Sequence, residues 1–155
     1  MHLKFRIILN VEEDVLRDII TDSNITLIEF SKIISSEFGF DSSEISTFHH
    51  SNENWEQLDE IKIFKIDEED KIMDNTTISN FFISKGDKLI FIYDFLNYWT
   101  FFIELYDLDE SINTKNYECV NSIGDVPKTP PSDIFDINSV KEDSDELDFD
   151  DTFID

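Results

Sequence analysis

The sequence predicts an α+β fold, with a mixed sheet that has one main helix packed on a face and an added C-terminal strand. Residues 88–105 contain two apolar, aromatic and β-branched runs on either side of Leu96 and Asn97. This is the pattern of a β-hairpin with a two-residue loop. Residues 27–38 show the apolar periodicity of a helix. The predicted elements follow the order strand, strand, helix, strand, strand, short helix, strand, strand.

A hairpin is expected to open the chain. Residues 2–9 alternate between apolar and polar side chains, which favours a strand. A polar turn follows at 10–14, and residues 15–20 continue as a second strand.

The main helix has clear signals at both ends. Thr26 and Glu29 have the spacing of a capping box, in which each side chain accepts a hydrogen bond from the backbone N–H of the other residue. Gly39 is suited to the left-handed conformation that ends a helix. The predicted buried stripe consists of Leu27, Phe30, Ile33, Ile34 and Phe38.

Two further strands are predicted before the central hairpin, at residues 45–50 and 61–66, and residues 71–73 are a candidate for another short strand. A short helical turn is expected within 76–82, followed by a turn at Gly86 and Asp87.

With Leu96 and Asn97 as the hairpin loop, Ile92 is expected opposite Phe101, and Ile90 opposite Ile103. Both faces of this ribbon are apolar, so we expect it to be covered on both sides. The complete order of elements resembles a ubiquitin-like β-grasp, and the resemblance extends to residues 76–92 (TTISNFFISKGDKLIFI).

Three regions are expected along the chain: an α+β core at 1–107, an irregular extension at 108–127, and an acidic, disordered tail at 128–155. The tail carries ten acidic and two basic residues, interleaved with apolar ones that include Phe149 and Phe153. Such a pattern is typical of disordered interaction segments, although a purely solubilising tail remains an alternative.

Composition restricts the classes of function. The formal net charge of −24 repels phosphate backbones and anionic lipid, which disfavours nucleic-acid and membrane partners and is compatible with a basic protein partner. The single cysteine, Cys119, cannot form an internal disulfide, and no signal peptide or membrane span is evident, so the cytoplasm is the expected location. No phosphate-binding glycine loop, nucleophile elbow or Cys-x-x-Cys motif is present, so we expect no enzyme activity and no cofactor.

Several segments together resemble the plasmid pRiA4b ORF-3-like family, from about Leu3 to about Pro127. They are the opening strand, Leu16-Arg17 where the family tends to have Trp-Arg, residues 26–40 (TLIEFSKIISSEFGF), and residues 93–103 (YDFLNYWTFFI). In the last segment the family pattern is Tyr-Asp-Phe-Gly-Asp, then Trp, then His. This chain keeps Tyr93, Asp94, Phe95 and Trp99 but has Leu96, Asn97 and Phe101 at the other positions.

The family also tends to place histidines where this chain has Glu44 and Ser46. The resemblance implies an α+β fold and a loose association with mobile elements. It implies little about function, and any site built from the family's histidines would be largely missing here.

Few residues stand out as candidates for a site. The possible interaction residues are Tyr98, Trp99, Phe102, Phe149 and Phe153, although core packing explains the first three equally well. Asp94 interrupts the apolar hairpin, either as a turn residue or as a functional carboxylate. His49 and His50 are adjacent on a predicted strand and point to opposite faces, so no metal site is expected there.

The leading hypothesis is a non-enzymatic module that binds an unknown protein. One alternative is an acidic nucleic-acid mimic that binds a DNA-binding protein. Another is a degenerate metal or enzyme site related to the family's histidines.

Overall fold

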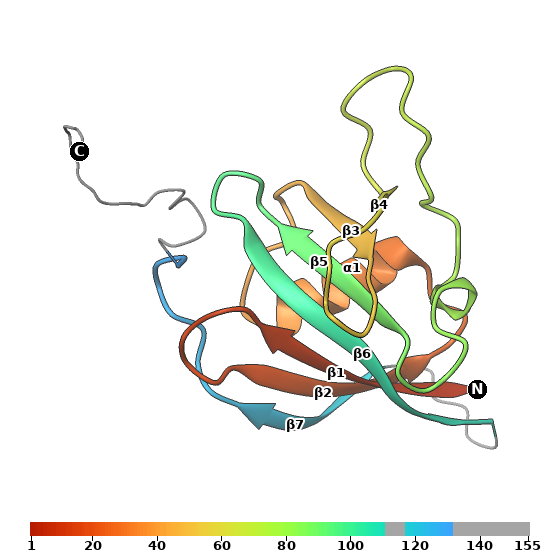
Figure 1. Cartoon of the computed structure of the whole chain (residues 1–155), viewed down its shortest axis with the longest axis vertical. Helices are drawn as coiled ribbons and strands as arrows, with labels where there is room; N and C mark the ends of the chain where they lie inside the picture. Colours follow the sequence, from red (N-terminus) through yellow and green to blue (C-terminus); the bar gives the residue numbers. More distant parts are fainter. Residues whose placement is uncertain (111–116, 132–155) are drawn as a thin grey trace.

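The computed structural model describes residues 1–110 and 117–131 of the chain. Within these residues, seven strands form one sheet in the order β4-β3-β5-β6-β1-β2-β7 (Figure 1). The strands are β1 (His2–Leu9), β2 (Leu16–Asp22), β3 (Ser46–His50), β4 (Glu60–Lys62), β5 (Lys88–Tyr93), β6 (Trp99–Asp109) and β7 (Glu118–Ile123). The helical elements are α1 (Leu27–Glu37) and the 3₁₀ turn η1 (Ile78–Asn80).

The prediction of a mixed, β-grasp-like sheet is wrong, because every neighbouring pair of strands in the described sheet is antiparallel. A tight hairpin joins β5 to β6, and such a short connection permits only antiparallel pairing. The long strand β6 then runs back between β5 and β1 and pairs with both. The fold is therefore a mostly β structure with a single α-helix in the described residues.

The helix begins where the sequence predicts it. The Glu29 N–H donates to the Thr26 hydroxyl at 3.1 Å, and the Thr26 N–H donates to the Glu29 carboxylate at 2.8 Å, so the capping box is confirmed. The chain leaves the helix through Phe38 and Gly39, and Gly39 has a φ of +80° that glycine adopts without a steric penalty.

The core lies between α1 and one face of the sheet. The Phe5 ring on β1 lies 4.8 Å from the Phe30 ring on α1 and 4.7 Å from the Phe82 ring, measured between centroids. Burying each such side chain contributes about 1.5–3 kcal/mol. The largest fully buried side chains are Phe5, Phe30, Phe48, Phe82, Phe91, Phe101, Leu3, Ile7, Leu9, Ile19, Leu27 and Ile34.

The opposite face of the sheet is partly covered by the loop between β3 and β4, which lies in front of β5 and β6 in Figure 1. Its Trp55 ring packs 5.1 Å from the Phe102 ring, and the Lys88 ammonium lies 5.3 Å from the Trp55 centroid. Ile90 and Ile92 are consequently buried although they face away from α1.

The central hairpin exists, but its predicted register is wrong by one residue. Phe91 pairs with Phe101, and the last pair before the turn is Tyr93 with Trp99, so the loop spans 94–98 instead of Leu96 and Asn97 alone. Asp94 and Tyr98 both have positive φ, and the Tyr98 N–H donates to the Asp94 carbonyl at 2.6 Å. A slip of one residue exchanges the two faces of a strand relative to its partner.

The structure also differs from the irregular extension expected at 108–127, because β6 continues to Asp109 and residues 118–123 form β7 at the edge of the sheet. Most β7 side chains are exposed, so the strand lacks the apolar alternation that marks a half-buried strand.

The strands predicted at 61–66 and 71–73 are largely absent, because this region forms only the short β4 and a loop. The Met73 N–H donates to the Lys62 carbonyl at 2.7 Å and so holds the loop against β4.

No helix in the described part of the chain is long and apolar enough to cross a membrane. The predicted tail lies outside the described residues from 132 onward, including Phe149 and Phe153.

Candidate functional site

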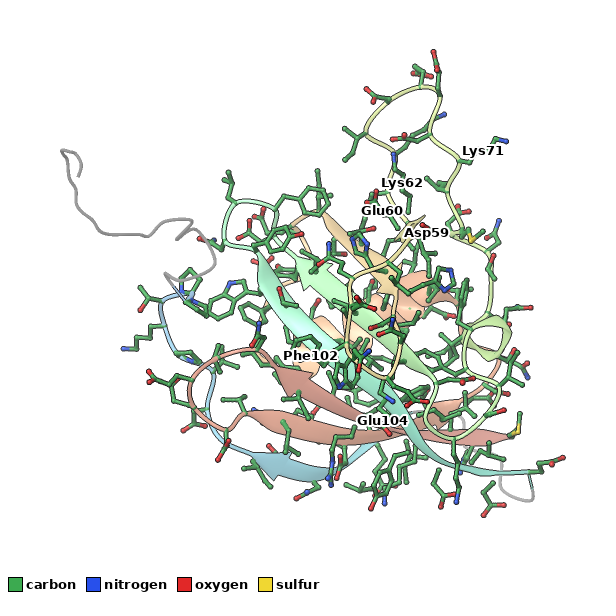
Figure 2. All side chains as sticks on the ribbon, viewed as in Figure 1. Asp59, Glu60, Lys62, Lys71, Phe102 and Glu104 are labelled. Carbon is green, nitrogen blue, oxygen red and sulfur yellow. The ribbon has the colours of Figure 1, made fainter. Side chains whose placement is uncertain are left out.

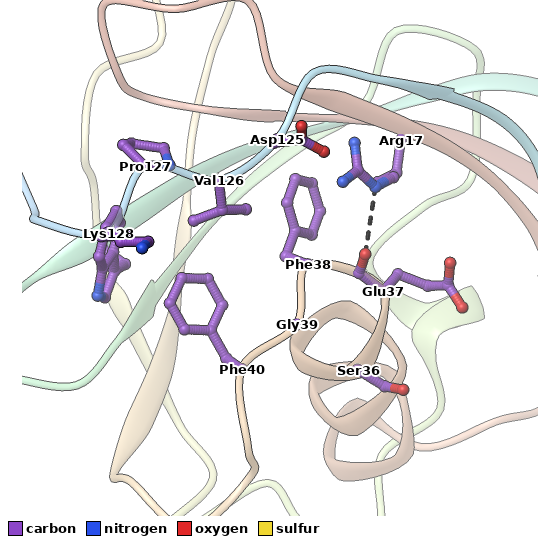
Figure 3. Close-up of a pocket in the computed structure, with 11 residues that line it drawn as sticks. Arg17, Ser36, Glu37, Phe38, Gly39, Phe40, Asp125, Val126, Pro127 and Lys128 are labelled. Carbon is purple, nitrogen blue, oxygen red and sulfur yellow. Dashed lines mark hydrogen bonds between the residues drawn. The ribbon is translucent and has the colours of Figure 1, made fainter.

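An open cleft of about 510 Å³ lies at the C-terminal end of α1 (Figure 3). Four separate parts of the chain form it: β2, the end of α1 with the residues after it, the start of β6, and the segment after β7. Its lining residues are Arg17, Ser36, Glu37, Phe38, Gly39, Phe40, Trp99, Asp125, Val126, Pro127 and Lys128. The volume falls within the range of about 300–1,000 Å³ that is usual for ligand sites.

The helix end places two aromatic rings at the cleft. The Phe40 N–H donates to the Ser35 carbonyl at 2.8 Å, which closes the last turn around Gly39. Phe38 packs inward, 4.8 Å from the Phe101 ring, and Phe40 packs 5.0 Å from the Trp99 ring. The wall of the cleft is therefore aromatic because of where the helix stops.

The opposite wall depends on Gly124. This residue has a φ of +78°, and a Cβ added to it would collide with the Asp14 carbonyl in the β1–β2 turn. The close approach directs residues 125–128 across the cleft toward Phe40 (Figure 3).

Arg17 connects these walls. It is only 8 % exposed, and its guanidinium lies 5.0 Å from the Phe38 centroid in a cation–π contact. The Arg17 Nε donates to the Glu37 carbonyl at 3.1 Å. The Arg17 Nη1 donates at 2.8–3.1 Å to three backbone carbonyls, those of Leu16, Ile123 and Gly124.

The predicted interaction residues do not form one surface. Trp99 is buried and lines the cleft. Tyr98 lies in the hairpin loop, where its hydroxyl accepts a hydrogen bond from the Gln57 side chain at 3.2 Å. Phe102, labelled in Figure 2, lies on the face of the sheet that points away from α1, where its ring packs 5.1 Å from the Trp55 ring. The other two, Phe149 and Phe153, fall outside the described residues.

Asp94 is a turn residue in the structure. Its carboxylate accepts hydrogen bonds from the Leu96 N–H at 3.1 Å and from the Asn97 amide at 2.5 Å. These bonds hold a loop in which Asp94 itself adopts a φ of +65°. They give the residue a structural role, and a functional role for its carboxylate stays a prediction.

Residues that carry the family pattern converge near the cleft although they are far apart in sequence. Tyr93 packs 5.2 Å from the Phe40 ring, and its hydroxyl donates to the Asp41 carbonyl. Ser46 pairs with Tyr93 across the sheet, and both Ser46 and Phe101 are buried. Two of the positions where the family tends to have histidine are thus filled here by buried side chains that are not typical metal ligands.

The remaining candidates from the sequence do not form a site in the described residues. His49 Nδ1 lies 3.0 Å from the Leu58 carbonyl oxygen, whereas the His50 ring lies 5.8 Å from the Phe81 ring. Within residues 1–110 and 117–131, no three His, Cys, Asp or Glu side chains are placed to hold a metal ion. Burial and the neighbouring Glu37 carboxylate raise the pKa of the Cys119 thiol, which lowers its thiolate fraction at neutral pH.

Sequence reasoning missed most of the cleft, including Arg17, Phe40, Asp125 and Lys128. Arg17 offered a signal, since it alternates in sequence with the buried residues Val15 and Ile19, and a charged residue in such a position requires partners. Asp125 and Lys128 gave no such signal, because they are exposed residues that reach the cleft only through the path of the chain after β7.

Comparison with known proteins agrees with the fold and with the family pattern. The model of the family described as plasmid pRiA4b ORF-3-like protein matches residues 2–148. A crystal structure of MM3350, a protein of unknown function from Methanosarcina mazei Go1, has a TM-score of 0.62 and 17 % identity over 78 % of this chain and 69 % of that chain. At this identity the likeness shows the fold alone, and no curated protein matches the chain. The match over most of the sequence shows that the chain belongs to the plasmid pRiA4b ORF-3-like protein family.

Proposed function

We propose that this protein is a non-enzymatic, cytoplasmic module that binds another protein, and that the cleft at the C-terminal end of α1 is its binding surface. The observation that carries the proposal is that Trp99, Phe40 and Arg17 line one open cleft. The Arg17 Nε and Nη1 bind backbone carbonyls, whereas its Nη2 makes no hydrogen bond within the described residues. Aromatic and arginine side chains are enriched at the centres of protein interfaces. The single cysteine supports the cytoplasm as the compartment.

The test is a pull-down from native lysate with the full chain as bait, at low and at high salt. Val126→Glu places a charge in the apolar part of the cleft, where Val126 is partly buried. Val120→Glu is the matched control, because Val120 is 42 % exposed on the edge strand β7 and does not line the cleft. Circular dichroism of each bait confirms that it is folded.

A protein retained by the wild-type chain and by Val120→Glu, but lost with Val126→Glu, is the expected result. Equal retention by all three baits would place the binding surface elsewhere, and no specific retention at either salt would contradict the module itself. A further bait that stops after Pro131, and so keeps Lys128, measures how much the acidic segment beyond it contributes.

A second candidate function is nucleic-acid mimicry, which the net charge of −24 favours. This candidate expects a basic, DNA-binding partner whose retention falls steeply with salt and is the same for Val126→Glu and the wild-type chain. Retention that is insensitive to salt contradicts it.

A further inference from the structure

The Arg17 guanidinium has unused hydrogen-bonding capacity. The backbone carbonyls described above occupy its Nε and Nη1. The third nitrogen, Nη2, has no acceptor within residues 1–110 and 117–131 and is not among the buried atoms that lack a partner. Arg17 is 8 % exposed and lines the cleft, so its Nη2 is the nitrogen that can donate to a ligand there.

The charges around this nitrogen differ in sign. Asp125 lines the same cleft as Arg17, and no ion pair joins the two side chains within 4.0 Å. The Lys128 side chain extends from the other end of the same wall and has no ion-pair partner in the described residues. The Glu37 carboxylate points away from the cleft and accepts a hydrogen bond from the Tyr117 hydroxyl at 2.7 Å.

We propose that the cleft recognises a carboxylate side chain in an acidic, aromatic peptide segment of the partner. Arg17 Nη2 would bind the carboxylate through a charge-assisted hydrogen bond, and the Lys128 ammonium, at the other end of the wall, would attract it across the cleft. The neighbouring apolar residue of the peptide would pack on Phe40, Trp99 and Val126. This inference rests on the proposed function, because it names the chemistry of the partner for the same cleft.

Asp125 makes the inference testable in both directions. A carboxylate ligand is repelled by Asp125, so Asp125→Asn should tighten binding, whereas Lys128→Gln should weaken it. A cationic ligand would reverse both signs. Arg17 itself is a poor test position, because its removal takes away hydrogen bonds to four backbone carbonyls and threatens the fold.

The probe is a fluorescent nine-residue peptide in which aspartate alternates with phenylalanine and leucine, and its counterpart with asparagine at each aspartate. Fluorescence anisotropy with the full chain gives Kd for each pair. We expect the asparagine peptide to bind about tenfold more weakly, Lys128→Gln to raise Kd about threefold, and Asp125→Asn to lower it about threefold. Lys71→Gln and Asp59→Asn, whose residues lie away from the cleft (Figure 2), are the matched controls and should leave Kd unchanged.

Equal binding of the two peptides, unchanged Kd in both cleft variants, or shifts of the opposite sign would overturn the inference. These results are separable from those of the pull-down. If a partner is lost with Val126→Glu but the charge variants leave peptide binding unchanged, the protein-binding function is supported and carboxylate recognition is rejected. If peptide binding follows the expected pattern but the pull-down captures no partner, carboxylate recognition is supported and the protein-binding function is contradicted.

Discussion

The Tyr93 hydroxyl donates to the Asp41 carbonyl, beside the cleft. Burial of the ring and the nearby Asp41 carboxylate raise the pKa of Tyr93 to about 12, from an ordinary value of 10.0. A pKa that is higher in the folded state than in the unfolded state stabilises the fold below the unfolded value. This stabilisation is lost as the pH rises from about 10 to about 12.

Tyr93→Phe is therefore expected to flatten the alkaline fall in the free energy of unfolding over this pH range. At neutral pH it should cost about 1 kcal/mol, for the lost hydrogen bond. Urea denaturation at pH 7 and at steps above pH 9 measures both effects. Tyr106→Phe is the control, because Tyr106 is 48 % exposed. An alkaline fall in Tyr93→Phe as steep as that of the wild-type chain would contradict the assignment.

Asp94 provides a second test on one residue. Asp94→Ala loses both hydrogen bonds of the carboxylate and places alanine at a φ of +65°, so a loss of about 1–2 kcal/mol is expected. Asp94→Asn keeps an acceptor for the Leu96 N–H and tolerates the left-handed conformation, so its loss should stay below about 0.5 kcal/mol. Urea denaturation measures both. If asparagine is as costly as alanine, the negative charge itself stabilises the loop, through the bond that the carboxylate accepts from the Asn97 amide.

The helix is the element whose local signals are easiest to test. Thr26→Ala removes the acceptor for the Glu29 N–H and should lower the free energy of unfolding by about 1 kcal/mol. Thr129→Ala makes the same chemical change at an exposed position outside any helix and should be neutral. Thermal and urea denaturation of the two variants give the difference, and equal stability would show that the cap contributes nothing.

At the level of strands, β7 depends on contacts from elsewhere in the chain. Among the described strands it pairs with β2 alone, and Arg17 binds the carbonyls at its end. The Tyr117 hydroxyl, just before β7, donates to the Glu37 carboxylate at 2.7 Å. Backbone pairing and these side-chain bonds therefore hold a strand that buries little apolar surface.

The whole molecule carries a charge of −24, so its carboxylates repel one another in the compact state. Added salt screens this repulsion, and the urea midpoint should rise when NaCl is increased from about 10 mM to about 500 mM. The increase should shrink as the pH is lowered toward about 4, where carboxylates become protonated. A midpoint that falls with salt at neutral pH would show that ion pairs such as Arg6–Asp18, at 2.9 Å, outweigh the repulsion.

The sequence by itself determined the elements that depend on local signals. The capping box at Thr26 and Glu29, the glycine stop at Gly39 and the alternation of residues 2–9 act within a few residues, and each element formed where these signals placed it. The family pattern was also readable, because it rests on short segments that the chain keeps.

Only the tertiary structure decided the strand order, the hairpin register, the edge strand β7 and the cleft. The register depends on bonds that Asp94 makes inside the loop, and both faces of the ribbon are apolar, so hydrophobic alternation cannot choose between registers one residue apart. The antiparallel sheet arises because short connections reverse the chain, and β6 then pairs with β5 on one side and with β1 on the other. The cleft joins Arg17, the end of α1, Trp99 and residues 125–128, and contacts between such distant segments leave no periodic pattern in the sequence.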